Sequence, residues 1–370
     1  MPEYESLMKM RTVLLTVACL LSGAAVAQDA KPLAALPTVK APDPAQVALG
    51  RQLFFDPRLS GDATISCATC HDPDHGWADG LEMSKGYPGS LYFRNTPTAM
   101  NASLNRFVYW DGRLPANDMP TIVRDHIAEA HFMQADGRLV IERMRQIPSY
   151  ESAFKSTFGG EPTYGRILKS VAAFVQSLNS ADVPFDEFLG GDKSAMSDSA
   201  QLGLELFRGK AGCIQCHNGA MLSDGGFHSL GLVANRQIFA NPERHITFRR
   251  FFRTLGVPNY EHLRNDVGLC CVSKADHDME LMRTPTLREV SQTAPYMHDG
   301  QLATLADVVR FYNDGGGPRA SKDKLLEPLG LSDEEQSQLV EFLKSLSGKP
   351  ADATRPELPK YELRKLGENQ

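Results

Sequence analysis

The sequence contains the pattern Cys-x-x-Cys-His twice, and this repeat constrains the fold more than any other feature of the chain. The two copies comprise Cys67, Cys70 and His71 in one half and Cys213, Cys216 and His217 in the other. The pattern is typical of covalent attachment of c-type haem. The two cysteines form thioethers to the porphyrin, and the histidine becomes the proximal ligand of the iron. Four of the seven cysteines belong to these copies, so we expect two covalently bound haem c groups.

Two other uses of Cys-x-x-Cys fit the sequence less well. A zinc ribbon needs a second cysteine pair about 15 to 20 residues away, whereas these two pairs are far apart and have no second pair nearby. A thioredoxin-like redox pair does not need a histidine directly after its second cysteine, and here one follows both times. The sequence therefore favours haem over zinc and over disulfide exchange.

Residues 1–27 have the features of a secretory signal. Basic residues precede an apolar run at 13–21, and the small-residue tripeptide Ala25-Val26-Ala27 follows. This order predicts cleavage before Gln28, and the run is too short to span a bilayer as a mature helix. Because haem is joined to such motifs outside the bacterial inner membrane, we expect a periplasmic protein that does not span the membrane. The net charge of −6 gives no reason to expect nucleic acid binding.

The two halves of the chain share landmarks in the same order. Leu-Gly precedes each haem motif, at Leu49-Gly50 and Leu202-Gly203, and Thr-Pro-Thr follows it, at 96–98 and 284–286. Asp-Gly then occurs thirteen residues after the last threonine in both halves. This shared spacing predicts two cytochrome c-like haem domains related by internal duplication, with long loops. The expected divisions are a linker at 28–43, an N-terminal haem domain at 44–190, a C-terminal haem domain at 191–350 and a tail at 351–370.

Helical patterns dominate the rest of the chain. Ile167, Val171 and Phe174 recur at helical spacing, and Ser332 with Glu335 forms a capping box before another apolar face. No extended alternation predicts a sheet, so the expected fold class is mainly α. The second half has about forty more residues between its haem histidine and its Thr-Pro-Thr. We expect this insertion, roughly 226–281, to be loop-like.

Taken together, these motifs resemble a known family. The haem motifs, the paired Thr-Pro-Thr segments, Trp110-Asp111-Gly112-Arg113 and Pro295-Tyr296-Met297-His298-Asp299-Gly300 are similar to those of the bacterial di-haem cytochrome c peroxidases and the MauG-type enzymes. The resemblance covers about 44 to 347. It implies that the haem at His71 is the peroxide site and that the haem at His217 stores or delivers electrons.

The same resemblance implies the other axial ligands. Cytochrome c peroxidases place a methionine fourteen residues after the histidine that matches His298, whereas this chain has Tyr312 there, as the MauG-type enzymes do. Tyrosinate is a known haem ligand. Packing of an apolar helix face is the alternative role for Tyr312, and Met297 is the competing ligand. The family peroxidases also carry a loop histidine that ligates the resting peroxide haem. Residues 76–94 contain no histidine, so we expect an open sixth position.

A peroxide site needs a group that moves a proton between the two oxygens. Glu129 matches the acidic distal residue of the family. His126 is a second candidate, because an alignment of the two halves that allows a two-residue insertion puts it opposite Tyr312. It is expected to be a distal base or a sixth ligand. Solvated helix surface is the alternative reading for both residues.

Two further residues take roles from the resemblance. Trp110 corresponds to the family tryptophan between the haems, which can carry an oxidising equivalent from one iron to the other; simple packing is the alternative. Asn95 matches a residue that helps bind calcium, with backbone carbonyls near Lys274 and Asp276 completing the site. Oxygen donors of this kind suit calcium.

The expected function is reduction of hydrogen peroxide at the haem of His71, with electrons drawn through the haem of His217. The MauG-like features favour oxidation of a residue on a partner protein. The alternatives are a conventional cytochrome c peroxidase supplied by a small cytochrome or copper protein, a di-haem electron carrier without enzymatic activity, and a haem-based sensor. Four arginines of the insertion form either a docking surface for an acidic partner or ordinary solvated charge: Arg244, Arg249, Arg250 and Arg253. The adjacent cysteines Cys270 and Cys271 could form a vicinal disulfide in an oxidising compartment.

Overall fold

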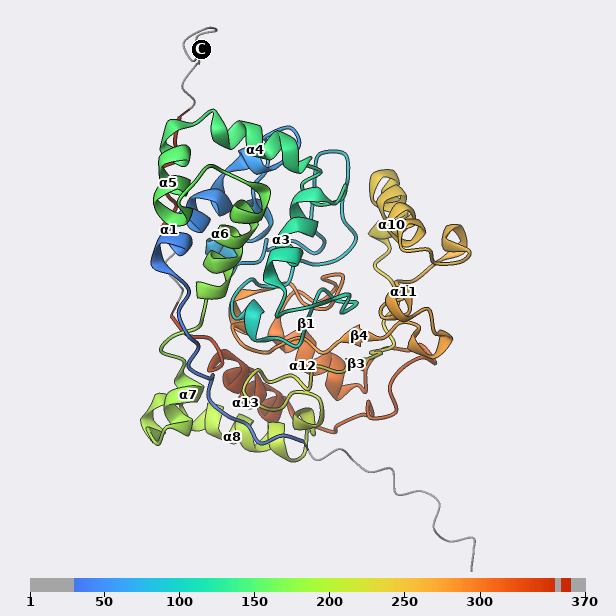
Figure 1. Ribbon diagram of the computed structural model, residues 1–370. Helices are drawn as coiled ribbons and strands as arrows, with labels where there is room; N and C mark the ends of the chain where they lie inside the picture. Colours follow the sequence, from blue (N-terminus) through green and yellow to red (C-terminus); the bar gives the residue numbers. More distant parts are fainter. Residues whose placement is uncertain (1–29, 350–353, 361–370) are drawn as a thin grey trace, which may run out of the picture.

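The computed structural model describes residues 30–349 and 354–360 and is mainly helical, as predicted (Figure 1). The signal segment predicted at 1–27 lies outside the described residues. Within the described ranges no helix is both long and apolar enough to cross a membrane. Among the described residues, the strands form two short antiparallel pairs, β1 (Phe107–Val108) with β2 (Leu114–Pro115) and β3 (Phe227–His228) with β4 (Met282–Arg283). The α-helices are α1 (Pro44–Phe55), α2 (Cys67–Cys70), α3 (Met119–Ala128), α4 (Gly137–Arg145), α5 (Pro148–Phe158), α6 (Tyr164–Ser177), α7 (Pro184–Leu189), α8 (Asp198–Arg208), α9 (Gln237–Ala240), α10 (Pro242–Thr254), α11 (Cys270–Ser273), α12 (Leu305–Asn313) and α13 (Asp333–Lys344).

The first hydrophobic core lies between residues 49 and 178, where α1 crosses α6. The two helices touch at Gly50, because a β-carbon there would lie 1.8 Å from the carbonyl oxygen of Ser170. The buried face of α6 includes the residues whose helical spacing is visible in the sequence. Asp118 caps α3, and this helix packs on α6 beside the first haem motif.

The second core lies between residues 183 and 346, where α8 crosses α13. The contact again falls on a glycine, since a β-carbon on Gly203 would lie 2.0 Å from the carbonyl oxygen of Gln338. The predicted capping box of Ser332 and Glu335 starts α13, and Thr304 with Asp307 forms another at the start of α12. In both halves, therefore, the helix before the haem motif crosses the last helix of that core at a glycine.

A third core joins the two halves. Phe93, from the loop after the first haem motif, packs with Phe248 and Phe252 of α10. The prediction that 226–281 is loop-like is wrong over α10, a helix of 13 residues that Asn241 caps. Phe248, Phe251 and Phe252 are buried at helical spacing, and burial of these rings against the first half stabilises the helix. In Figure 1, α10 and α11 lie at the right of the molecule.

The two ends of the described chain pack on opposite halves. Residues 30–43 precede the first core but lie along the second: Leu33 packs against that core, and the amide of Leu36 donates to Asp186 of α7. Residues 354–360 come after the second core but return to the first. Leu358 packs against it, and Arg355 forms ion pairs with two aspartates just after the first haem motif.

Candidate di-haem site

Each Cys-x-x-Cys-His motif lies in the wall of a cavity. The first cavity has a volume of about 160 Å³, and Cys67, Cys70 and His71 line it. The second has about 550 Å³, and the cysteines and histidine of the other motif line it. None of the four motif cysteines forms a disulfide in the described structure, so the thiols are available for thioether bonds. Paired thiols, one histidine and an apolar cavity are the donor set that haem c needs, and both sites fit it.

The proximal histidines are oriented in the same way in both cavities. Nδ1 of His71 lies 3.0 Å from the carbonyl oxygen of Trp77, and Nδ1 of His217 lies 3.0 Å from that of Leu222. Burial lowers the pKa of both imidazoles, so they are neutral at pH 7. A carbonyl at Nδ1 fixes the tautomer that leaves Nε2 free to bind a metal.

Trp110 lies between the two cavities and lines both of them. Its Nε1 donates to the carbonyl oxygen of Asn95 at 2.9 Å, and its own carbonyl accepts from the amide of Arg283 at 2.8 Å. On the side of the second cavity, its ring meets the ring of His298 edge-on, with centroids 6.4 Å apart. The indole is therefore fixed at the boundary between the two cavities.

His126 faces His71 across the first cavity. It lies in the last turn of α3 and lines the cavity, and its ring centroid is 6.0 Å from that of His71. Nδ1 of His126 lies 2.8 Å from the carbonyl oxygen of Ile122 and 3.1 Å from the hydroxyl of Tyr109. Burial, followed by the neighbouring His71, lowers the pKa of His126 to about 4. Because the loop histidine of the family is missing, we expect the side of the first cavity opposite His71 to be open. In the structure, the neutral imidazole of His126 from α3 lies there.

Glu129 lies behind this wall and is absent from the described residues that line the first cavity. Its carboxylate is 2.9 Å from Nε2 of His131 and 3.5 Å from the guanidinium of Arg113. Burial opposes ionisation, but His131 and Arg113 lower the pKa of Glu129 below its usual value. The two predicted distal residues therefore differ in position: His126 lines the first cavity, whereas the ionised carboxylate of Glu129 lies outside the cavity wall.

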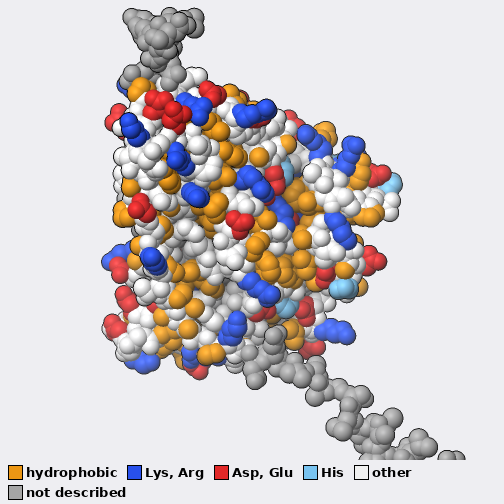
Figure 2. Space-filling model, viewed as in Figure 1, with side chains coloured by type: hydrophobic (Ala, Val, Ile, Leu, Met, Phe, Trp, Pro, Cys, Tyr) orange, Lys and Arg blue, Asp and Glu red, His pale blue; other side chains and the backbone are white. Residues whose placement is uncertain are grey.

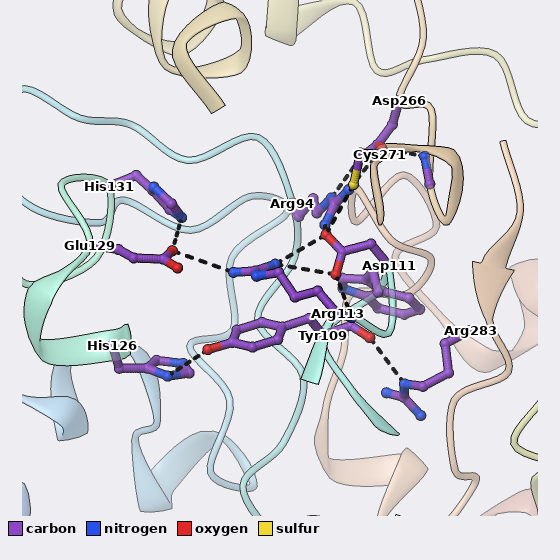
Figure 3. Close-up of polar contacts among 12 residues, drawn as sticks. Arg94, Tyr109, Asp111, Arg113, His126, Glu129, His131, Asp266, Cys271 and Arg283 are labelled. Carbon is purple, nitrogen blue, oxygen red and sulfur yellow. Dashed lines mark hydrogen bonds and ion pairs between the residues drawn. The ribbon is translucent and has the colours of Figure 1, made fainter. Parts of the chain in front are cut away.

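A buried network of charges supports both distal residues (Figure 3). Asp111 accepts from Arg94 at 2.5 Å and from Arg113 at 3.1 Å, and Arg94 also binds Asp266 of the insertion at 2.6 Å. The side chains of Arg94, Asp111 and Asp266 are at most 1% exposed. The guanidinium of Arg113 also lies over the ring of Tyr109, 3.5 Å from its centroid.

Sequence analysis missed the roles of Tyr109, Arg113 and Arg94. Arg113 is the last residue of the Trp-Asp-Gly-Arg motif, and Tyr109 directly precedes that motif. Their position in or beside the motif was the available sign that residues other than its tryptophan contribute to the site. Tyr109 has a φ of 62°, a conformation that aromatic residues rarely adopt. This backbone turns the phenol toward His126 while Trp110 points to the boundary between the cavities.

Tyr312 and Met297, the two candidate axial ligands of the second haem, both line the second cavity. Tyr312 comes from the apolar face of α12, as the sequence predicts. Burial, followed by the thiols of Cys213 and Cys216, raises the pKa of Tyr312 well above its usual value. Its phenol is therefore protonated unless a metal binds the oxygen.

Asn95 is buried between the halves and belongs to the walls of both cavities. Its amide nitrogen donates to the carbonyl oxygen of Leu81 at 2.8 Å, and its backbone N–H donates to the carbonyl oxygen of His298 at 2.8 Å. The side-chain oxygen is the atom that could bind a cation. Lys274 ends α11, and its ammonium donates to the carbonyl of Cys271 at 2.6 Å.

The arginine surface expected on the insertion is only partly a surface. Arg244 is 9% exposed and donates to the carbonyl oxygen of Ser84, so its place in that prediction is wrong. Acidic and basic side chains are interspersed over the face shown in Figure 2. Cys270 and Cys271 are buried free thiols in the described structure, and Cys271 lies 3.7 Å from Asp111.

Comparison with known proteins identifies the family of the chain. The family model described as di-haem cytochrome c peroxidase matches residues 44–194. The chain is 45% identical to cytochrome-c peroxidase IdrP2 of Pseudomonas sp. (strain SCT), over 97% of this chain and 95% of that protein. It is 36% identical to methylamine utilization protein MauG of Methylorubrum extorquens, over 85% of this chain and 82% of that one.

A solved structure supports the same assignment. It is a MauG-like protein associated with microbial copper homeostasis, with a TM-score of 0.71 and 27% identity, and the match covers 87% of this chain and 94% of that one. These three relatives are thus named as a cytochrome-c peroxidase, a MauG protein and a MauG-like protein. The chain belongs to the di-haem cytochrome c peroxidase and MauG family, and it is a haem c peroxidase whose oxidising substrate is hydrogen peroxide.

Proposed function

We propose that the chain is a periplasmic peroxidase that reduces hydrogen peroxide at the haem of the first cavity and draws electrons through the haem of the second. Each haem, when bound, supplies an iron that exchanges single electrons. Reduction of one peroxide to two water molecules consumes two electrons and two protons. The observation that carries this division of work is Trp110, whose indole lines both cavities. We propose that it relays electrons from the second cavity to the first.

The proton chemistry is assigned to Glu129. The lowered pKa keeps its carboxylate ionised at neutral pH, which is the state of a base that takes a proton from peroxide and returns it to the leaving oxygen. Arg113 and His131 hold the carboxylate beside the first cavity. Since Glu129 is outside the cavity wall, its side chain must turn toward the cavity for this transfer.

Two donors are candidates for the electrons. A tyrosine at position 312 favours an aromatic residue on a partner protein, as in the MauG type. Identity of 45% to a protein named cytochrome-c peroxidase favours a small cytochrome or copper protein. In both cases the donor would act at the surface nearer the second cavity.

Spectra of the ferric holoprotein before and after one equivalent of peroxide test the proposal. A long-lived change in the spectra of both haems, without added reductant, supports oxidation of a partner residue. A reaction that requires partial reduction first supports the cytochrome c donor. If neither the ferric nor the partly reduced protein consumes peroxide, the chain is an electron carrier and the proposal fails.

We also propose that the two halves derive from duplication of one haem-binding unit. This proposal is supported by the matched helix crossings at Gly50 and Gly203 and by the matched carbonyl contacts of His71 and His217. Thr98 and Thr286 occupy matched places as well, because each hydroxyl donates at 2.6 Å to a backbone carbonyl just after the haem histidine of its own half.

Two proposals concern the setting of the enzyme. Periplasmic location is supported by the signal features of 1–27 and by the two covalent haem motifs, and cell fractionation with a haem stain tests it. A calcium ion at the side-chain oxygen of Asn95 is supported by the burial of that residue between the halves and by the affinity of calcium for amide oxygens.

A further inference from the structure

The distance between His126 and His71 carries information about the first haem. Two imidazoles that bind one metal through Nε2 have ring centres about 6 Å apart, from two metal–nitrogen bonds of about 2 Å and about 1 Å from each Nε2 to its ring centre. The observed separation is 6.0 Å, with the rings inclined by 54°. Rotation about the common axis permits any inclination, so the two rings are spaced as a pair of axial ligands.

The hydrogen bonds of His126 leave the correct nitrogen free. The carbonyl of Ile122, 2.8 Å from Nδ1, can only accept, so Nδ1 carries the proton and Nε2 keeps its lone pair. This is the arrangement of the two proximal histidines, His71 and His217, whose Nδ1 atoms also lie against backbone carbonyls. It is typical of histidines that bind metals.

Contacts with two neighbouring aromatic rings hold the ring of His126 in place. His126 is stacked on Tyr109, with centroids 5.4 Å apart and planes 16° apart, and on Phe132, at 4.7 Å and 8°. The Tyr109 hydroxyl lies at its Nδ1, and the packing of α3 on α6 holds the helix. A surface histidine that only faces solvent would need none of these contacts.

We propose that His126 is the sixth ligand of the first haem in the resting ferric protein, in place of the open position that the sequence predicts. The inference rests on the proposed function and adds regulation to it. Peroxide reaches the iron only after the imidazole has moved away. The protecting ligand comes from α3, whereas residues 76–94 of the loop supply none.

The spin state of the ferric holoprotein tests this proposal directly. We expect the electron paramagnetic resonance spectrum of the wild type to lack a high-spin haem. In His126→Leu one haem per chain should become high-spin, with both haems still attached by haemochrome assay. In His126→Gly, added imidazole should restore the low-spin signal.

A matched control and a second measurement sharpen the test. His131→Leu alters a buried histidine of the same region whose Nε2 faces Glu129, and it should leave the spin state unchanged. Because a closed site lowers apparent affinity by its open fraction, and minor states are commonly about 0.1 to 10% populated, ferric His126→Leu should bind azide about 10- to 1000-fold more tightly than the wild type.

The outcomes separate this inference from the proposed function. A high-spin haem in the resting wild type overturns the inference, even if the Leu variant fails to load haem. A His126 that acts only as a base gives that high-spin spectrum, and its removal then slows the peroxide reaction without changing the spin state. If peroxide is still reduced in that case, the function stands. Failure of both resting and reduced protein to consume peroxide removes the function instead.

Discussion

Replacement of Asp111 by asparagine should destabilise the protein by an amount that the structure allows us to estimate. The carboxylate is 0% exposed and is bound by Arg94 and Arg113. Burial raises its pKa, but the two arginines lower it further, to about 2 from 3.8. A carboxyl group with this difference contributes roughly 2.5 kcal/mol to the free energy of unfolding at neutral pH. For a chain of this size, the loss corresponds to roughly 3 to 4 °C in melting temperature.

The pH dependence of the effect has a definite sign. Because the pKa of Asp111 is lower in the folded state, its contribution is complete above about pH 4 and is lost as the pH falls toward 2. Urea unfolding of the wild type and Asp111→Asn, followed by far-ultraviolet circular dichroism from pH 7 to pH 3, should show a stability difference that narrows below pH 4. An equal difference at pH 7 and pH 3 would refute the reasoning.

Asp136→Asn is the matched control. Asp136 also has a pKa of about 2, mainly because the side chain of Arg138 hydrogen-bonds to it, but the two side chains are 49% and 90% exposed. Water screens such pairs, and asparagine caps a helix as well as aspartate does. The melting temperature of Asp136→Asn should therefore equal that of the wild type. If it falls as far as that of Asp111→Asn, burial is not the cause.

Four other outcomes are expected. Glu129→Gln should slow the reaction with peroxide about 10²- to 10³-fold in stopped-flow absorbance, because the proton-transfer group is lost, and an unchanged rate would exclude that role. Trp110→Phe should leave peroxide binding intact and slow electron transfer between the haems in the same instrument; equal rates would show that the indole carries no electrons. Tyr312→Phe should change the absorption spectrum of the second haem, and an unchanged spectrum would remove Tyr312 as a ligand. Calcium removal by a chelator should lower the melting temperature of the wild type but not that of Asn95→Ala, and equal responses would place calcium elsewhere.

The haem motifs, the helix caps and the mainly helical class could be predicted because each depends on residues close together in the sequence. The capping boxes at Thr304 and Ser332 are examples. The helix α10 was also readable, since Phe248, Phe251 and Phe252 follow helical spacing, but a run rich in arginine hid the pattern. The local sequence pattern was therefore sufficient to predict this helix.

The arrangement around the first cavity could not be predicted in the same way. His126 faces His71 because α3 packs on α6, and sequence spacing does not give the angle of that packing. The ion pair of Arg94 with Asp266 joins residues 172 positions apart. Such contacts depend on how the insertion folds back on the first half, which no short motif records.

The placement of the two ends bears on how the molecule can be divided. The segment at 30–43 lies on the second core, and the segment at 354–360 lies on the first. A gene divided between residues 178 and 183 would give each product one haem motif. The N-terminal product would lack the segment 354–360 that packs on its core, and the C-terminal product would lack the segment 30–43. A single-haem fragment should therefore include the terminal segment that packs on its core, although the other half of the gene encodes that segment. Simple truncations lack it.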